Sequence, residues 1–188
     1  MIVMDEDTCM VDVARFFINF LLEESCGKCI PCREGLRVLN KVLTDICDGK
    51  GREDYIQTSE DVTETMREAS LCALGTTAAN PVLSTLTYFR DEYEAHIKEH
   101  RCPAKACKEL TAYYTNPRKC MACLICLRSC PVNAIMGEKD IVHVINQEKC
   151  IRCGICYVSC PFGAVEKISP PTPPLIQYGL KVERKKKR

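Results

Sequence analysis

The chain has 188 residues, of which 46% are hydrophobic, and its formal net charge at pH 7 is +1. This length suffices for one or two small domains with cores of their own, and the near-zero charge gives no sign of a nucleic-acid or membrane-surface partner. Sixteen cysteines approach the content of a secreted disulfide scaffold, but the acidic start MIVMDEDTCM lacks a signal peptide's design, so we predict a soluble, cytoplasmic protein with metal-binding cysteines.

The first half of the chain has a helical pattern. Residues 1–7 are predicted to be the remnant strand of a missing upstream domain. Apolar residues then recur three and four apart, and the helices that they predict cover residues 8–24, 33–47, 59–69 and 80–100. Cys9 is interpreted as a packed core thiol, while Asn80 and Pro81 suit the start of the last helix. Residues 8–100 are therefore predicted to form a small four-helix domain.

The segment ESCGKCIPCREG follows the first predicted helix and carries three cysteines in close succession. Three thiolates at C-x2-C-x2-C spacing make an incomplete ligand set, so a fourth donor is needed. Cys72, in the loop SLCALG between two later helices, can supply it if the helical hairpin folds back. The spacing favours a 4Fe-4S cluster, with a zinc site as the alternative, and the predicted ligands are Cys26, Cys29, Cys32 and Cys72.

Residues 101–109 are predicted to be a linker with a second candidate metal site. The run HIKEHRCPAKAC puts two histidines one helical turn apart and two cysteines directly after them. Imidazole and thiolate at a helix end suit tetrahedral zinc. The predicted zinc ligands are His96, Cys102 and Cys107, with Cys47 or His100 as the fourth. The alternative is that the cysteines are simply buried and His100 is a solvated cation at a helix end.

Residues 110–168 contain an internal repeat, since KCMACLICLRSCPVNAI from Lys119 matches KCIRCGICYVSCPFGAV from Lys149. Each copy reads C-x2-C-x2-C-x3-C-P, which resembles the bacterial two-cluster ferredoxins. There the fourth cysteine ligates the sister cluster. The predicted 4Fe-4S ligand sets are Cys120, Cys123, Cys126 and Cys160, and Cys150, Cys153, Cys156 and Cys130. Paired zinc sites are the less favoured alternative.

The two copies differ at one position, because the first loop has no glycine where the second has Gly154. We therefore expect different backbone hydrogen bonding and different cluster potentials. Short alternating stretches predict strands over residues 110–114, 141–145 and 165–168, so the fold class is α+β. His143 is predicted to be a surface residue of such a strand. Residues 169–188 form a proline-rich and basic tail.

ESCGKCIPCREG, followed by SLCALGTTAANPVLSTLTYFRDEYEAHI, resembles the C-terminal part of the NADH-binding flavoprotein subunit of complex I and its counterparts in NAD(P)-linked iron-only hydrogenases and formate dehydrogenases. The resemblance covers residues 1–168. It implies one 4Fe-4S cluster on the four cysteines from Cys26 to Cys72, and a zinc site near the hinge to the ferredoxin module. That appended module is a feature of the hydrogenase-type members. No glycine-rich phosphate loop is found, so no FMN or NAD site is expected.

Together these features predict the iron-sulfur electron-transfer module of an NAD(P)H-linked oxidoreductase, with three 4Fe-4S clusters, one zinc and no complete active site. Electrons would pass between a flavin site on a separate part and a hydrogenase-type partner subunit or a soluble ferredoxin. Neither nucleic-acid binding nor membrane insertion is expected in this interpretation. One alternative is a free-standing ferredoxin-like carrier, and another is a zinc-stabilised nucleic-acid-binding protein that uses the basic end KVERKKKR.

Overall fold

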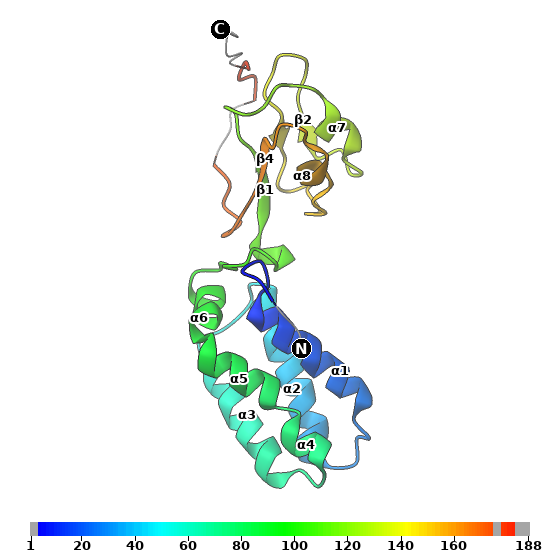
Figure 1. Ribbon diagram of the computed structural model, residues 1–188, viewed down its shortest axis with the longest axis vertical. Helices are drawn as coiled ribbons and strands as arrows, with labels where there is room; N and C mark the ends of the chain where they lie inside the picture. The colour runs from blue at the N-terminus through cyan, green and yellow to red at the C-terminus, as the bar shows by residue number, and fades with distance from the viewer. Residues whose placement is uncertain (1–3, 175–177, 183–188) are drawn as a thin grey trace. The chain divides into compact units, whose positions relative to one another are not determined.

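The computed structural model describes residues 4–174 and 178–182, and the chain divides into two compact units, Met1–Leu110 and Thr111–Arg188 (Figure 1). The first unit is helical and the second contains small helices and sheets, so the α+β class is confirmed. Residues 1–3 of the predicted first strand and residues 183–188 of the basic end lie outside the described residues, and residues 4–7 form no strand. Within the described ranges, no helix is long and apolar enough to cross a membrane.

The helical unit contains more helices than the four that were predicted. A short helix follows Cys72, and the helix predicted from Asn80 is divided at Phe89, whose φ of −134° and ψ of 35° are not helical. Among the described residues the helices are α1 (Met10–Glu24), α2 (Ile30–Cys47), α3 (Tyr55–Ala69), α4 (Ala73–Thr77), α5 (Asn80–Tyr88) and α6 (Arg90–Lys98), followed by the 3-10 helix η1 (Lys108–Leu110).

The core of the helical unit is built mainly from aliphatic side chains. Their spacing of three and four along α2 places them on one face, and the fully buried ones are Leu36, Leu39, Leu43 and Ile46. Burial contributes roughly 1.5–3 kcal/mol for each such side chain. A Cβ atom at Gly35 would lie 2.5 Å from the Met66 side chain, so α2 and α3 approach closely at that point.

The two cysteine groups of the helical unit lie at its opposite ends. Cys9 directly precedes α1 and Cys26 follows it, and the 15 residues of this helix span about 22 Å. Figure 1 shows the connection between α1 and α2 at the same end as α4, while the start of α1 and the end of α6 lie at the other end. The candidate cluster and the candidate zinc site are therefore well separated.

The second unit is a duplicated arrangement of very short elements. Helices α7 (Ile125–Ser129) and α8 (Ile155–Ser159) occupy equivalent positions in the two copies of the cysteine motif. Strand β1 (Ala112–Thr115) pairs antiparallel with β4 (Val165–Ile168). Strand β2 (Ile135–Met136), which was not predicted, pairs antiparallel with β3 (Val144–Ile145). The core of this unit includes the cysteines themselves.

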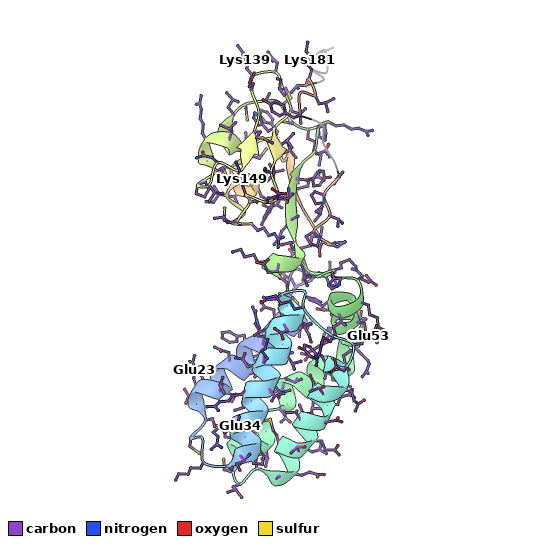
Figure 2. The ribbon with its side chains drawn as sticks, turned by 180° about the vertical axis from the view of Figure 1, so that it is seen from behind. Glu23, Glu34, Glu53, Lys139, Lys149 and Lys181 are labelled. Atoms are coloured by element: carbon purple, nitrogen blue, oxygen red, sulfur yellow. The ribbon has the colours of Figure 1, made fainter. Side chains whose placement is uncertain are left out.

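Part of the predicted tail folds back onto the second unit. The Val142 N–H donates to the Leu180 carbonyl at 2.8 Å, and the Val182 N–H donates to the Asp140 carbonyl at 3.0 Å. Figure 2 shows Lys139 and Lys181 close to each other, in keeping with the antiparallel bridge between Ile141 and Lys181. Backbone pairing therefore ties the chain around Leu180 and Val182 to the second unit.

Candidate iron-sulfur and zinc sites

The two cysteine loops of the second unit have the same backbone conformation. Left-handed residues occupy equivalent positions, with φ of 52° at Ala122 and 55° at Arg152, and φ of 65° at Leu124 and 78° at Gly154. This conformation costs an L-residue about 1–2 kcal/mol, while glycine adopts it freely. The loops therefore differ in residue type at the glycine position but share the turn that brings three cysteines together.

The first ferredoxin-type loop gathers its thiols with a cysteine of the other copy. Cys160 packs against a small buried cluster that contains Cys120. Burial, followed by the charges of nearby cysteines, raises the pKa of Cys126 to about 12, and those neighbours are Cys120, Cys123, Cys160 and Cys156. The first three of these neighbours complete the ligand set that the spacing predicts.

The second loop shows the reciprocal arrangement. Burial raises the pKa of Cys156 to about 11, and the charges of Cys150, Cys153 and Cys130 add to this shift. One cavity is lined by all four of these cysteines together with Tyr113 and Ile145. The structure thus brings Cys130 of the first copy to the thiols of the second.

Backbone amides point at the fourth cysteine of each copy. The Ala134 N–H donates to Cys130 Sγ at 3.2 Å, and the Ala164 N–H donates to Cys160 Sγ at 3.3 Å. Such donors stabilise thiolate character and are typical of the surroundings of iron-sulfur clusters. Four converging thiols with amide donors around them fit a 4Fe-4S cluster at each position.

In the helical unit, the cysteine-rich loop meets the segment that carries Cys72. Hydrogen bonds from the backbone N–H groups of Leu71 and Cys32 lower the pKa of Cys29. A Cβ atom at Gly75 would lie 2.5 Å from Ser70 Cβ and 3.2 Å from Cys32 Cβ, so the start of α4 packs closely on this loop. The hairpin therefore brings the residue before Cys72 to the cysteine loop, and Cys26, Cys29, Cys32 and Cys72 stay the predicted ligands of a 4Fe-4S cluster.

The loop itself is shaped by residues between its cysteines. Gly27 has a φ of +69°, which is the left-handed region that favours glycine. Its N–H donates to Ser25 Oγ at 3.3 Å, and its carbonyl accepts a hydrogen bond from Arg33 Nη1 at 2.9 Å. Cys26 is exposed while Cys32 is buried and lies 3.4 Å from Ser25 Oγ. One end of the cysteine triad therefore faces solvent.

At the other end of the helical unit, four buried donors converge. The ligand atoms of the group all lie within 4.8 Å of one another, and its members are Cys9, His96, Cys102 and Cys107. His96 Nε2 lies 3.4 Å from Cys9 Sγ and 3.3 Å from Cys107 Sγ, and the two sulfur atoms are 3.7 Å apart. One imidazole and three thiols form a set that zinc binds tetrahedrally in structural sites.

The histidine of this group is oriented for metal binding. His96 Nδ1–H donates to the Glu92 carbonyl at 2.7 Å, which leaves Nε2 without hydrogen and directed at the thiols. Hydrogen bonds with Cys107 and Cys9 lower the pKa of Cys102, whereas hydrogen bonds with Cys102 and then Cys107 raise the pKa of Cys9. One thiolate is thus already favoured, and a metal ion would displace the remaining protons.

The fourth member of the candidate zinc site differs from the prediction. Cys9, interpreted as a core thiol, joins the three predicted donors His96, Cys102 and Cys107. Cys47 is buried and hydrogen-bonds with Cys107, but among the described residues neither it nor His100 belongs to the converging group. The N-terminal position of Cys9 on α1 brings it to α6, which the helical periodicity alone does not reveal.

The prediction that His143 is a surface residue is also wrong. Its side chain is 1% exposed, and its Nδ1 atom lies 3.1 Å from Cys126 Sγ. Strand β3 begins one residue later than this position, so the alternation that placed His143 outward does not apply. This residue therefore belongs to the surroundings of a candidate cluster.

Comparison with known proteins finds iron-sulfur families in both parts of the chain. Residues 12–96 match the NADH-ubiquinone oxidoreductase-F iron-sulfur binding region, and residues 113–136 and 143–166 match the 4Fe-4S binding domain. The chain is 46% identical over 143 residues to the NADP-reducing hydrogenase subunit HndC of Solidesulfovibrio fructosivorans, covering 76% of this chain and 29% of that protein.

A second relative is the F subunit of the NADH-quinone oxidoreductase of Streptomyces coelicolor, which is 46% identical over 99 residues, covering 53% of this chain and 22% of that protein. The crystal structure of an NAD+-reducing NiFe hydrogenase in the H2-reduced state matches with a TM-score of 0.50 and 34% identity, covering 52% of this chain and 17% of that chain. The chain thus spans less than a third of the length of these relatives.

Proposed function

Because residues 12–96 match the NADH-ubiquinone oxidoreductase-F iron-sulfur binding region and two matches to the 4Fe-4S binding domain follow, we propose that the chain relays electrons through three 4Fe-4S clusters. Bound to its cysteines, each cluster accepts and releases one electron at a time. The observation that carries this proposal is the reciprocal gathering of thiols in the second unit, where each loop meets the fourth cysteine of the other copy.

The proposed ligands in the second unit form two crossed sets. Support comes from the packing of Cys160 on the buried cluster that contains Cys120, from the cavity shared by Cys130 and the second loop, and from the amide donors to both outer cysteines. The first set is Cys120, Cys123, Cys126 and Cys160, and the second is Cys150, Cys153, Cys156 and Cys130. Crossing the ligands ties the two copies of the repeat into one folded unit.

The third cluster is proposed for the helical unit. The contact between Cys29 and the backbone of Leu71 supports it, because Cys72 is the next residue along the chain. The proposed ligands are Cys26, Cys29, Cys32 and Cys72. Two of these ligands, Cys26 and Cys72, are exposed, which suits exchange of electrons with a partner at this end of the unit.

A zinc ion is proposed for the opposite end of the helical unit. Its ligands would be Cys9, His96, Cys102 and Cys107, which join the start of α1, α6 and the segment after α6. Zinc has no redox chemistry, so these residues would act as a structural clamp and not as an electron carrier. Full burial of His96 and Cys102 agrees with a closed, structural site.

The proposed partners are a flavin- and NAD(P)H-binding part and a catalytic subunit of hydrogenase type. Support comes from the two relatives, which are named as an NADP-reducing hydrogenase subunit and an NADH-quinone oxidoreductase subunit. Because these 188 residues contain no glycine-rich phosphate loop, the chain's own residues would carry electrons to or from an active site on another part of the assembly. A soluble ferredoxin is a further candidate for exchange with the second unit.

The proposal is tested by counting electrons. Anaerobically purified protein should take up about three electrons per chain in a reductive titration followed by EPR, one for each cluster. Cys72→Ala should lower this to about two and leave the signals of the second unit unchanged, because only one ligand set is broken. Cys47→Ser, a buried cysteine outside all four proposed sets, is the matched control and should keep three. Uptake of fewer electrons by the unaltered chain would refute the three-cluster assignment.

A second experiment separates a module of an assembly from a free-standing carrier. Purification from the native host under anaerobic conditions should yield the chain in a complex that contains bound flavin and oxidises NADH or NADPH. Recovery of the chain only as a monomer, with reversible redox activity and no bound flavin, would support the free-standing carrier instead.

A further inference from the structure

We propose that His143 donates a hydrogen bond to the Cys126 sulfur and thereby raises the reduction potential of the cluster held by the Cys120 loop above the value that it would otherwise have. This inference rests on the proposed function, because it concerns a cluster on these ligands. It identifies a specific source of inequality between two clusters whose ligand spacing is identical.

The contact itself is short and sheltered from water. His143 Nδ1 lies 3.1 Å from Cys126 Sγ, and the side chains are 1% and 5% exposed, respectively. A sulfur atom that ligates iron is a thiolate and has no hydrogen to donate, so Nδ1 must carry the hydrogen of this bond. Burial lowers the pKa of His143, which favours the neutral imidazole with one N–H.

The surroundings hold the imidazole in this position. A Cβ atom at Gly137 would clash with His143 Cδ2, so the ring occupies space that only a glycine leaves open. The Val142 backbone on one side is paired with Leu180, and Val144 on the other side belongs to β3. Nε2 is buried and has no hydrogen-bond partner in the described part of the chain, so Cys126 is the contact that accounts for this polar ring.

The repeat shows that the second copy of the motif lacks the same donor. Under the alignment that matches Lys119 with Lys149, His143 is equivalent to Tyr113. Burial raises the pKa of Tyr113, and the charges of Cys156, Cys153 and Cys150 add to this shift, so each residue lies beside the cysteine loop of the other copy. Tyr113 directs its hydroxyl toward Gly154, where an added Cβ atom would lie 2.9 Å away. One loop therefore faces an imidazole and the other a phenol.

The sign of the effect follows from charge. Reduction adds negative charge to the cluster and its sulfur ligands, so a hydrogen-bond donor stabilises the reduced form more than the oxidised form. A hydrogen bond to a charged acceptor corresponds to about one to two orders of magnitude in an equilibrium constant, and only the part gained on reduction shifts the potential. Loss of the His143 donor should thus favour the oxidised cluster about tenfold at a fixed potential, which equals about 59 mV for a one-electron couple.

The test is an EPR-monitored redox titration at fixed pH of the full chain with all clusters bound. His143→Leu removes the donor and should lower the midpoint potential of one cluster by about this amount, while His143→Gln, whose amide can donate, should restore part of it. Tyr113→Phe is the matched control at the equivalent position and should leave that cluster's potential unchanged. A purely structural role predicts a loss of cluster content without a change in the potential of the clusters that stay bound.

A measurement on the unaltered chain covers the case in which the variants lose their clusters. His143 is the only one of the three histidines in the second unit, so labelling with 15N-histidine reports on this contact. Pulsed EPR of the reduced protein should show a 15N coupling to one ferredoxin-type cluster. Unchanged potentials in His143→Leu, or the absence of this coupling, would overturn the inference and leave the proposed function intact. Failure to find any cluster would overturn both.

Discussion

The two units of the chain obtain their stability from different sources. The helical unit has a core of leucine and isoleucine side chains on α2 that pack against α1 and α3. The main core of the second unit contains six buried residues, and two of them, Cys126 and Cys156, are candidate ligands. Its partly buried neighbours include three further cysteines.

This difference indicates what each unit needs in order to fold. The second unit, Thr111–Arg188, is too small to be stable on such a core without help, and metal binding is a common source of the missing free energy. The helical unit can bury enough apolar surface to keep its helices without any cluster. The sites of the second unit are thus part of its fold, whereas those of the first lie at the ends of a helical framework.

The largest expected effect is that of removing the metals. In apo-protein the second unit should unfold, because its core is then left with protonated thiols and few apolar groups, while most of the helical unit persists. Hydrogen exchange followed by mass spectrometry should show fast exchange over residues 111–168 and continued protection in α2. Protection of both units in the apo-protein would contradict this view of the two cores.

A substitution in the aliphatic core should destabilise the helical unit and leave the second unit unaffected, which is the reverse of metal removal. Leu39→Ala removes a fully buried side chain and should cost the helical unit about 2–5 kcal/mol of unfolding free energy. Denaturant unfolding followed by circular dichroism measures this cost. The ferredoxin-type EPR signals should stay unchanged. Val38→Ala, on the same helix and 39% exposed, is the control and should change stability by less than about 0.5 kcal/mol.

Substitutions at Gly154 and at the equivalent Leu124 should have a smaller effect on stability. Gly154→Ala places a Cβ atom on a left-handed residue and 2.9 Å from the Tyr113 hydroxyl, so it should destabilise its loop by about 1–2 kcal/mol. Leu124→Gly relieves the same conformational cost while losing a half-buried side chain, so its net effect should be close to zero. Anaerobic thermal bleaching of the cluster absorbance compares the two variants. If both variants lose cluster stability equally, the left-handed turn does not determine the stability of these loops.

The smallest expected effect concerns the pairing of β1 and β4. Glu166 accepts hydrogen bonds from Lys119 Nζ and Asn116 Nδ2, both at 2.9 Å, and from the Tyr114 hydroxyl, and these bonds lower its pKa to about 2. A lowered pKa stabilises the fold above the unfolded value of 4.5, so the contribution is complete at pH 7 and is lost only as the pH falls toward 2.

We expect Glu166→Gln to lower the unfolding free energy at pH 7 by less than about 1 kcal/mol, because this half-buried network still borders solvent that screens its charges. The difference should shrink at high salt, which screens exposed charges. Thermal melts of the two proteins at low and high salt measure this change. A salt-independent loss would point to packing instead of charge.

The sequence was most informative where the candidate metal ligands lie close together along the chain. The two C-x2-C-x2-C-x3-C-P motifs and their regular spacing could be interpreted without a structure, since a local loop determines most of the geometry. The contact between Cys29 and the Cys72 loop also agrees with the prediction, because a helical hairpin brings its two ends together.

Long-range and conformational features could not be predicted in this way. Cys9 lies far before His96 in the sequence, and its place on an amphipathic helix has the signature of a core residue. The helix that was predicted from Asn80 ends at Phe89, although no glycine or proline lies at this position to signal the end. His143 lies just before the short strand β3, so the alternation rule assigned its side chain to the wrong side. In each case tertiary contacts decided the outcome over local pattern.

The most direct test of the whole account is the metal content of the anaerobically purified chain. Twelve proposed cluster ligands in three sets of four predict about twelve iron and twelve acid-labile sulfide per chain, and the Cys9 site predicts about one zinc. A colourless protein that contains zinc but neither iron nor sulfide would contradict the account in both units.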